Sequence, residues 1–304
     1  MNILNLIRWK NILMIALVQL LIKYALLEPF GVSTRLDVLG ILLLILASTC
    51  IAAAGNIIND INDVETDFIN KPDRILVGHA ISEKTAYTLF IIFNLVGVGS
   101  GFYLSHHVGR APFFIIFVLI SALLYIYATQ LKRTLLIGNI VISVLVGMSI
   151  LIIGVFDLLP EITTSNRPTQ IIFFKVVFDY ALFAFIINLL REISKDIEDI
   201  DGDYKAGMNT LPIAIGRDRA KNILVALNFI PLIGIICYVV SDLYKEIITV
   251  CYFLIMVIGP LIYISIKTFS ANLKDDFHHI SNMYKLVMLF GMLSLLLYKY
   301  VILN

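Results

Sequence analysis

The sequence predicts an all-α integral membrane protein: a bundle of about nine transmembrane helices, with two parallel four-helix repeats around a central cavity. Apolar residues make up 60% of the chain and charged residues only 15%. The mean hydropathy is +0.93, well outside the range of soluble domains. Apolar runs of roughly 20 residues, the length that spans a bilayer, recur along the chain with short polar breaks. A short acidic motif also occurs twice. We therefore expect a single transmembrane domain over residues 1–304.

The expected spans follow from the apolar runs, and aromatic residues such as Trp9, Tyr103 and Tyr244 lie near several of their ends, as is typical of the headgroup zone. The spans are 12–27, 38–58, 85–104, 112–129, 135–156, 171–190, 222–240, 247–266 and 284–303.

The distribution of charge predicts the orientation of the chain. The formal net charge is only +1, so nucleic acid is excluded as a partner on electrostatic grounds. If the helices alternate from a cytoplasmic N-terminus, most of the Lys and Arg residues fall on the cytoplasmic side, as the positive-inside rule requires. The exceptions are Lys23, Arg35, Arg110, Arg167, Lys175, Lys245 and Lys299. We expect a multi-pass protein of the cell (plasma) membrane, with both acidic motifs facing the cytoplasm.

The acidic motif follows the second and the sixth expected spans. Residues 59–67 and 195–203 share the pattern D-x-x-D-x-x-x-D. On a helix, positions i, i+3 and i+7 lie on one face, so each copy predicts a stripe of three carboxylates. Four spans separate the copies, so they share one orientation, and parallel repeats can place them across one cavity. The two stripes are Asp60, Asp63 and Asp67, and Asp196, Asp199 and Asp203.

Clustered carboxylates at a membrane boundary need positive charge beside them. Oxygen ligands without His or Cys suit Mg²⁺, which commonly binds one or two carboxylates together with substrate phosphate oxygens. We expect the Mg²⁺ ligands to be Asn59, Asp63, Asp67, Asp199 and Asp203. The basic residues expected to bind a diphosphate are Lys71, Arg74, Lys132, Arg133 and Lys195. Asp60 and Asp196 are the candidates for a catalytic general base, one of them serving if it stays uncoordinated.

A metal–diphosphate site with Lys and Arg beside it, above an apolar helix bundle, suits a substrate with an anionic head and a hydrocarbon tail, such as a prenyl diphosphate. Mg²⁺ and basic side chains would absorb the charge that develops on the departing diphosphate, which favours cleavage of the allylic C–O bond. An acceptor nucleophile would then capture the carbocation-like C1, while a water-poor cavity limits hydrolysis. This predicts a Mg²⁺-dependent prenyltransferase acting on a lipid or aromatic acceptor.

These residues resemble the UbiA superfamily of intramembrane prenyltransferases, whose members share nine helices and two Asp-rich motifs. Residues 59–67 match the family motif N-D-x-x-D-x-x-x-D, and Asp199 and Asp203 match its second motif, D-x-x-x-D. Residues 70–82 are similar to the segment N-K-P-x-R-P-L-P-x-G-x-I-S, with Ile75 and Val77 in place of two prolines. The resemblance covers the whole chain and implies Mg²⁺-dependent transfer of a prenyl group from its diphosphate.

Within the superfamily, residues 191–203, followed by Thr210–Pro212, are most similar to geranylgeranylglycerol-phosphate geranylgeranyltransferases. That resemblance implies geranylgeranylglyceryl phosphate as the acceptor, in ether-lipid synthesis. Aromatic-acceptor enzymes of quinone biosynthesis have related motifs and remain an alternative. A transporter that binds ions or protons through intramembrane carboxylates is the alternative from another class.

Several polar residues receive a structural interpretation. The pairs His106–His107 and His278–His279 lack a partner at helical spacing and are interpreted as interfacial loop residues, while Asn94 and Asn188 are expected to hydrogen-bond between helices. The three cysteines lie inside expected spans without metal-ligand spacing and are interpreted as packing residues. No obligate protein partner is inferred.

Overall fold

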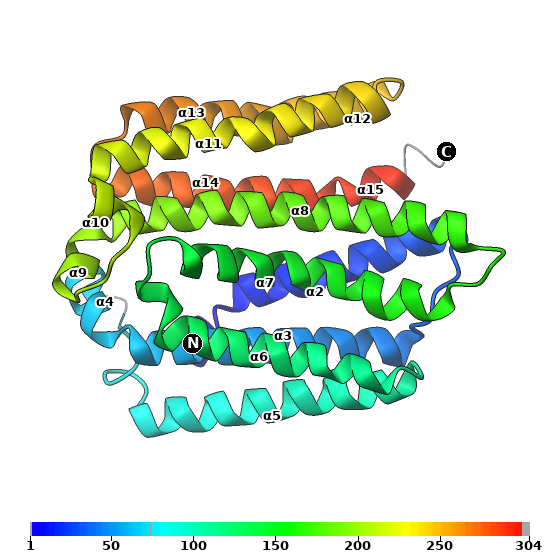
Figure 1. The fold of residues 1–304 in the computed structure, drawn as a ribbon, viewed down its shortest axis with the longest axis horizontal. Coiled ribbons are helices and arrows are strands. Elements are labelled where there is room, and N and C mark those ends of the chain that lie inside the picture. Colours follow the sequence, from blue (N-terminus) through cyan, green and yellow to red (C-terminus); the bar gives the residue numbers. More distant parts are fainter. Residues whose placement is uncertain (1, 73–74, 300–304) are drawn as a thin grey trace.

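Nine membrane-length helices run side by side in the computed structural model, which describes residues 2–72 and 75–299 (Figure 1). The fold class is therefore as predicted. The long helices are α2 (Trp9–Leu21), α3 (Val38–Asn62), α5 (Glu83–His107), α6 (Phe114–Thr129), α7 (Ile137–Ile153), α8 (Arg167–Glu198), α11 (Arg217–Tyr238), α12 (Ile247–Phe253) with α13 (Gly259–Ser270), and α14 (Lys274–Leu293) with α15 (Leu295–Leu297). Short π and 3-10 segments extend α2 to Phe30, α7 to Glu161 and α11 to Leu243, and join α12 to α13.

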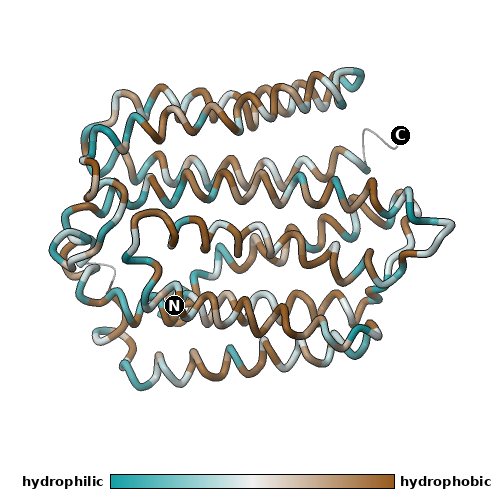
Figure 2. Tube along the Cα trace, in the orientation of Figure 1, coloured by the Kyte–Doolittle hydropathy of each residue, from teal (hydrophilic) through white to brown (hydrophobic). Residues whose placement is uncertain are grey.

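The outer surface of the bundle is apolar, as a lipid-facing surface must be. Leu95, Ile255 and Phe269 are each about 70% exposed, and such side chains recur along the helices. Figure 2 shows hydrophobic helix centres between two hydrophilic ends. In water a continuous apolar surface of this size would drive association, so the medium that surrounds these helices is the hydrocarbon of a bilayer.

The packing repeats between the two halves of the chain. In the first half α3 packs on α2 and α5, and in the second half α8 packs on α7 and α11. The ninth span, α14, packs on α8 and α13. One buried apolar core joins α2, α3, α5 and α6 of the first half to α7, α8 and α14, and a second core joins α8, α11, α13 and α14. The helices α2, α3, α7, α8 and α14 meet at the centre of the bundle. The two parallel repeats predicted from the motif are thus present in the helix packing.

Helix ends follow local sequence. The carboxylate of Asp37 caps α3 by accepting a hydrogen bond from Gly40 N at 2.7 Å, and Ser82 Oγ caps α5 by accepting from Thr85 N at 3.2 Å. Short helices complete one end of the bundle, and Figure 1 shows them together. They are α4 (Val64–Asn70), α9 (Ile200–Lys205) and α10 (Leu211–Ile215), with α1 (Asn2–Leu6) preceding the first span.

Three expectations need correction. The ninth span begins at Lys274, ten residues before the expected start, because the polar first turns of α14 face other helices and the cavity instead of forming a loop. His106 and His107 end α5, and His278 and His279 lie within α14, so neither pair is in a loop. Cys237 and Cys251 are exposed on the bundle surface, and only Cys50 is a buried packing residue.

Candidate active site

A cavity of about 740 Å³ opens between the two halves of the bundle. Its wall contains all six aspartates of the two motifs at one end, and apolar side chains such as Ile15, Phe117 and Leu124 further in. The size lies within the range of small-molecule sites. The cavity therefore has a strongly charged end, formed by the two motifs, which we call the mouth, and an apolar interior.

The first motif crosses a break between two helices. α3 ends at Asn62, Asp63 has the backbone angles φ −96° and ψ −3°, and α4 starts at Val64. These angles belong to the sparsely populated bridge region, where many active-site residues lie. The expectation of one continuous helical stripe is therefore wrong: Asp60 lies on α3, Asp63 at the break and Asp67 on α4.

The second motif repeats this geometry. α8 ends at Glu198, Asp199 has φ −98° and ψ 7°, and α9 follows from Ile200. Gly207, with φ +69°, follows the end of α9. α4 packs against α9, so the two breaks face each other. The sequence repeat is thus also a repeat of backbone conformation, centred on the middle aspartate of each copy.

Asn70 joins the two motifs directly. Its Nδ2 donates to the backbone oxygen of Asp199 at 3.0 Å and to Asp203 Oδ1 at 3.4 Å, and its Oδ1 accepts from Gly202 N at 3.0 Å. Lys274 Nζ donates to the backbone oxygen of Asn70 at 2.5 Å, which ties the start of α14 to the same point. Asn70 was not expected at the site, although it begins the segment that matches the family pattern.

Two of the expected basic residues donate hydrogen bonds to motif carboxylates. Lys132 Nζ donates to Asp63 Oδ2, and Lys71 Nζ donates to Asp199 Oδ2 at 2.6 Å, with Glu198 Oε1 3.8 Å away. Each of the two breaks therefore carries one lysine. Such lysines can exchange a carboxylate for the phosphate oxygens of a bound substrate.

The other basic candidates are placed differently. Lys195 lines the cavity but donates to Glu192 Oε2 at 2.8 Å instead of contacting a motif carboxylate. The Arg133 side chain is not part of the described cavity wall, although its backbone oxygen accepts from Asn209 N at 2.9 Å. Arg74 lies outside the described residues.

Burial and mutual repulsion shape the electrostatics of the mouth. Burial, and then the neighbouring carboxylates of Asp199 and Asp63, raise the pKa of Asp203 to about 7. Burial likewise raises the pKa of Asp67. For Lys132, burial opposes the charged form, but the adjacent Asp63 carboxylate outweighs it and raises the pKa. The mouth thus holds excess negative charge that a cation would relieve.

The oxygen atoms of the motifs fit a magnesium ion. Asn59 Nδ2 donates to Asp63 Oδ2 at 2.6 Å, which turns the amide oxygen of Asn59 away. That oxygen and Asp199 Oδ1 are buried and, within the described chain, accept no hydrogen bond. Each motif therefore has one unused buried acceptor, an arrangement that normally indicates a missing ligand. No three His, Cys, Asp or Glu side chains among the described residues already form a cage, and Mg²⁺ commonly needs only one or two carboxylates besides water and phosphate oxygens.

The two candidates for a general base are both held by hydrogen bonds. Asp60 Oδ1 accepts from Arg8 Nη2 at 2.7 Å, and Asp196 Oδ2 accepts from Asn139 Nδ2 at 2.7 Å. Both aspartates line the cavity. These hydrogen bonds engage one oxygen of each carboxylate.

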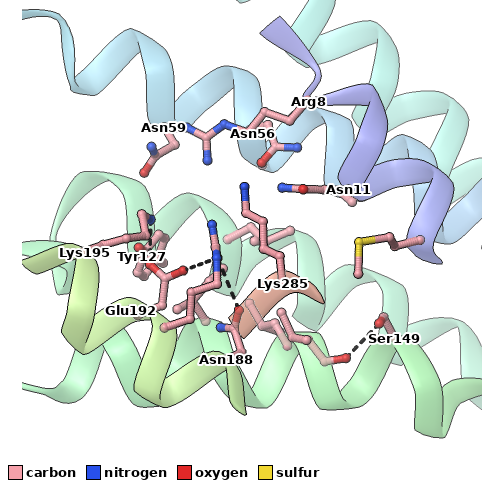
Figure 3. A pocket seen from close by; sticks show the side chains of 18 of the residues that line it. Arg8, Asn11, Asn56, Asn59, Tyr127, Ser149, Asn188, Glu192, Lys195 and Lys285 are labelled. Carbon is pink, nitrogen blue, oxygen red and sulfur yellow. Dashed lines mark hydrogen bonds and ion pairs between the residues drawn. The ribbon is translucent and has the colours of Figure 1, made fainter. Parts of the chain in front are cut away.

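Several cavity residues were missed by sequence reasoning. Figure 3 shows two of them, Arg8 and Asn56, on one side of the cavity and two others, Lys285 and Glu192, on the other, near the expected Lys195. Tyr127 also lines the cavity. His278 accompanies them, with Nδ1 3.0 Å from Glu198 Oε1. Isolated polar residues in apolar runs are the only sequence signal for this set, and that signal does not say which of them face the cavity.

The expected structural roles of the two intramembrane asparagines are confirmed. Asn188 Nδ2 donates to Ser143 Oγ at 3.1 Å, joining α8 to α7. Ser121 Oγ donates to Asn94 Oδ1 at 2.5 Å, joining α6 to α5. Asn188 also lines the cavity, so it serves both the packing and the wall.

Comparison with known proteins gives a consistent result. Residues 15–300 match the model of the UbiA prenyltransferase family. A digeranylgeranylglyceryl phosphate synthase from Methanosphaera stadtmanae is 34% identical over 262 residues, covering 83% of this chain and 86% of that protein. A solved structure described as that of digeranylgeranylglyceryl phosphate synthase in membranes has 25% identity and a TM-score of 0.63, and covers 98% of this chain and 97% of its own.

The fold is shared more widely. A UbiA homologue from Archaeoglobus fulgidus, solved with GPP and Mg²⁺, superposes with a TM-score of 0.55 at 16% identity, over 97% of this chain and 99% of that one. The family match covers nearly the whole chain, and the paired acidic motifs lie at the mouth of a cavity inside a nine-helix fold shared with UbiA homologues. This chain is a member of the UbiA prenyltransferase family.

Proposed function

We propose that this protein transfers a geranylgeranyl group from its diphosphate to the free hydroxyl of geranylgeranylglyceryl phosphate, in a Mg²⁺-dependent reaction of ether-lipid synthesis. The observation that carries the proposal is the pair of facing acidic breaks, each with an unused buried oxygen and a lysine, at the mouth of an apolar cavity. The relatives named for this synthesis support the choice of acceptor.

The residues that would hold Mg²⁺ are Asn59, Asp63, Asp67, Asp199 and Asp203. Bound there, Mg²⁺ would supply positive charge to the diphosphate oxygens as they become a leaving group. Lys71 and Lys132 each form an ion pair with a motif carboxylate. Each can exchange that carboxylate for a phosphate oxygen and so stabilise the negative charge that develops on the diphosphate. Both lysines then stabilise the departing diphosphate more strongly than the ground state, which is the condition for acceleration.

In the transfer itself, the acceptor oxygen forms a bond to C1 of the prenyl chain as the bond from C1 to the diphosphate oxygen breaks. The electron pair of that bond leaves with diphosphate, and the hydroxyl proton passes to a carboxylate. The proposed base is one of Asp60 and Asp196. The apolar cavity beyond the motifs holds the prenyl chain and limits competing hydrolysis by water.

The proposal includes the setting of the enzyme. The domain is the whole chain, residues 1–304, in the plasma membrane. The acidic end of the bundle, which also carries Lys71, Lys132 and Arg133, faces the cytoplasm in accord with the positive-inside rule. The protein acts without an obligate protein partner.

The test is an acceptor screen with purified protein and radiolabelled geranylgeranyl diphosphate. We expect labelled product with geranylgeranylglyceryl phosphate, none with aromatic quinone precursors, and none after exhaustive chelation of Mg²⁺. Product on aromatic acceptors alone would assign the protein to quinone synthesis instead. Ion flux in proteoliposomes without any prenyl transfer would favour a transporter.

A further inference from the structure

A second charged group lies in the cavity beside the acidic motifs. It consists of four cations, Arg8, Arg191, Lys195 and Lys285, which we call the cation cluster. All four line the cavity, where Arg191, Lys195 and Arg8 repel the Lys285 ammonium group and Glu192 attracts it. Figure 3 shows Arg8 on one wall, with Lys195 and Lys285 facing it from α8 and α14. The cluster therefore brings together the N-terminal segment, the sixth span and the ninth span.

Carboxylates offset only part of this charge. Arg8 is paired with Asp60 at 2.7 Å, while Arg191 and Lys195 share one carboxylate, that of Glu192, at 2.7 and 2.8 Å. Lys285 forms no hydrogen bond or ion pair with any described residue, and the buried Arg191 Nε has no acceptor there. Asp60 and Glu192 are the two carboxylates paired with the cluster, while Asp63 also attracts Arg8 and Asp196 also attracts Lys195.

Uncompensated positive charge between membrane helices is costly and usually marks a functional site. Here two independent observations indicate an anion: an unpaired lysine that points into the cavity, and a buried guanidinium N–H without an acceptor. A planar guanidinium beside an ammonium group is the usual protein arrangement for binding phosphate.

The diphosphate of the donor already has a place at the motifs, with Lys71 and Lys132. The reaction in the proposed function involves a second anion, the phosphate of the acceptor lipid. A phosphomonoester carries about −1.5 to −2 charges at pH 7, which suits the two cations of the cluster that have unused donors, Lys285 and Arg191.

We propose that the cation cluster binds the phosphomonoester of the acceptor, with Lys285 and Arg191 as its direct ligands. This rests on the proposed function and deepens it, because it explains how the acceptor is chosen. A site built to pair with a charged group rejects an analogue that lacks the group, since its own charges are then left uncompensated. Neutral glycerol lipids would be poor acceptors for this reason.

The test compares the wild-type protein with Lys285→Met, Lys285→Arg and the control Lys84→Met, an exposed lysine at the start of α5 outside the cavity. We expect Lys285→Met to raise the KM for geranylgeranylglyceryl phosphate about tenfold or more, a loss typical of one charged contact, and to leave the KM for geranylgeranyl diphosphate within about twofold. Lys285→Arg should restore most of the affinity. With geranylgeranylglycerol, which lacks the phosphate, wild type and Lys285→Met should have the same low kcat/KM.

Equilibrium binding of tritiated geranylgeranylglyceryl phosphate, without donor, separates this inference from the proposed function. Binding that Lys285→Met weakens, in a protein that transfers to no glycerol lipid, would support the site and overturn the function. Normal transfer with unchanged KM and binding in Lys285→Met would overturn the site alone. A raised KM for the donor would also overturn it, since the cluster would then serve the diphosphate. Absence of both binding and transfer in the wild type would overturn both. A monodisperse gel-filtration profile for each variant is required to show that the variant is folded.

Discussion

The side-chain amide of Asn70 lies flat against the backbone of Gly202, and this contact fixes the distance between the two acidic motifs. A Cβ atom added to Gly202 would lie 2.5 Å from the amide atoms of Asn70, closer than real Cβ contacts. Asn70 ends α4 and Gly202 lies in α9, so the contact joins the two halves of the repeat at their short helices. Glycine is required here for space, since only a residue without Cβ lets the amide approach.

We expect Gly202→Ala to lower kcat/KM by about tenfold or more while the protein stays folded. The added methyl group must push Asn70 away, which breaks its hydrogen bonds to Gly202 N and to Asp199 and moves the second motif relative to the first. Displacements of about 1 Å at a catalytic site can cost a hundredfold in rate. Steady-state kinetics with radiolabelled donor, together with thermal unfolding in detergent, would measure both effects.

Gly234→Ala is the matched control, because a Cβ at Gly234 on α11 would meet nothing within 4 Å. This variant should keep wild-type activity and be as stable as the wild type or slightly more so, since alanine favours helix. Wild-type activity in Gly202→Ala would show that the spacing of the motifs does not depend on Asn70.

The sequence predicts the number of spans and the repeat, but not the local geometry of the acidic motifs. The apolar runs predict nine spans, and two copies of one motif predict the parallel repeats, because both are properties of sequential spacing. Helical periodicity did not predict the breaks at Asp63 and Asp199, since the local sequence carries no Gly or Pro there. The contacts of α4 with α9 accompany both breaks and depend on tertiary structure.

The cavity wall was harder to predict for a related reason. Arg8 and Lys285 are far apart in the sequence and each looks like an ordinary cytoplasmic positive charge. Only the packing of α2, α8 and α14 shows that they face one another. Lys and Arg residues that orient the chain in the membrane and those that bind a ligand look the same in the sequence. Only the helix packing distinguishes them.

Asp63→Ala and Asp199→Ala should each reduce turnover by more than about a hundredfold, without loss of fold. Each removes the central carboxylate of one motif, and even outer partners of a metal site are worth about 10–100-fold. Asp201→Ala is the control, because Asp201 is 80% exposed and its ion pair with Arg217, at 3.7 Å, is worth little. Undiminished activity in both motif variants would refute a mechanism with two acidic clusters.

A buried ion pair far from the site stabilises the opposite end of the bundle. Lys23 is 2% exposed and donates to Asp157, which is fully buried and also accepts from Leu36 N at 2.7 Å. Asp157→Ala should lower the free energy of unfolding by about 3–5 kcal/mol, because it removes the closest carboxylate from a buried ammonium group. Lys23 would keep only Thr34 Oγ1 at 2.8 Å and the more exposed Glu28 at 3.8 Å. Thermal unfolding in detergent would show the loss as a lower Tm.

Two further variants distinguish the loss of the hydrogen-bond acceptor of Leu36 N from the loss of charge compensation at Lys23. Asp157→Asn keeps an acceptor for Leu36 N and should be less destabilising than Asp157→Ala. Lys23→Met combined with Asp157→Asn removes the unpaired charge and should recover part of the lost stability. A Tm for Asp157→Ala equal to that of the wild type would mean that Glu28, 3.8 Å from Lys23, or water compensates the Lys23 charge.

Lys71→Met should raise the affinity for Mg²⁺ and lower the enzyme activity. Lys71 Nζ lies 2.6 Å from Asp199 Oδ2 and therefore competes with any cation for that carboxylate. Without the lysine, Mg²⁺ affinity in the absence of substrate should rise by about tenfold, a modest change for the removal of one nearby charge at a partly exposed site. Isothermal titration with Mg²⁺ measures this directly.

The same variant should lower kcat/KM for geranylgeranyl diphosphate by roughly 10–100-fold, because the lysine no longer meets the charge that develops on the leaving group. Lys84→Met, which removes an exposed lysine at the same end of the bundle, should change neither quantity. If Lys71→Met instead weakened Mg²⁺ binding, Lys71 would be holding Asp199 in place for the metal. If it bound Mg²⁺ more tightly and turned over normally, Lys71 would have no part in stabilising the diphosphate, and Lys132 would remain the one described lysine bound to a motif carboxylate.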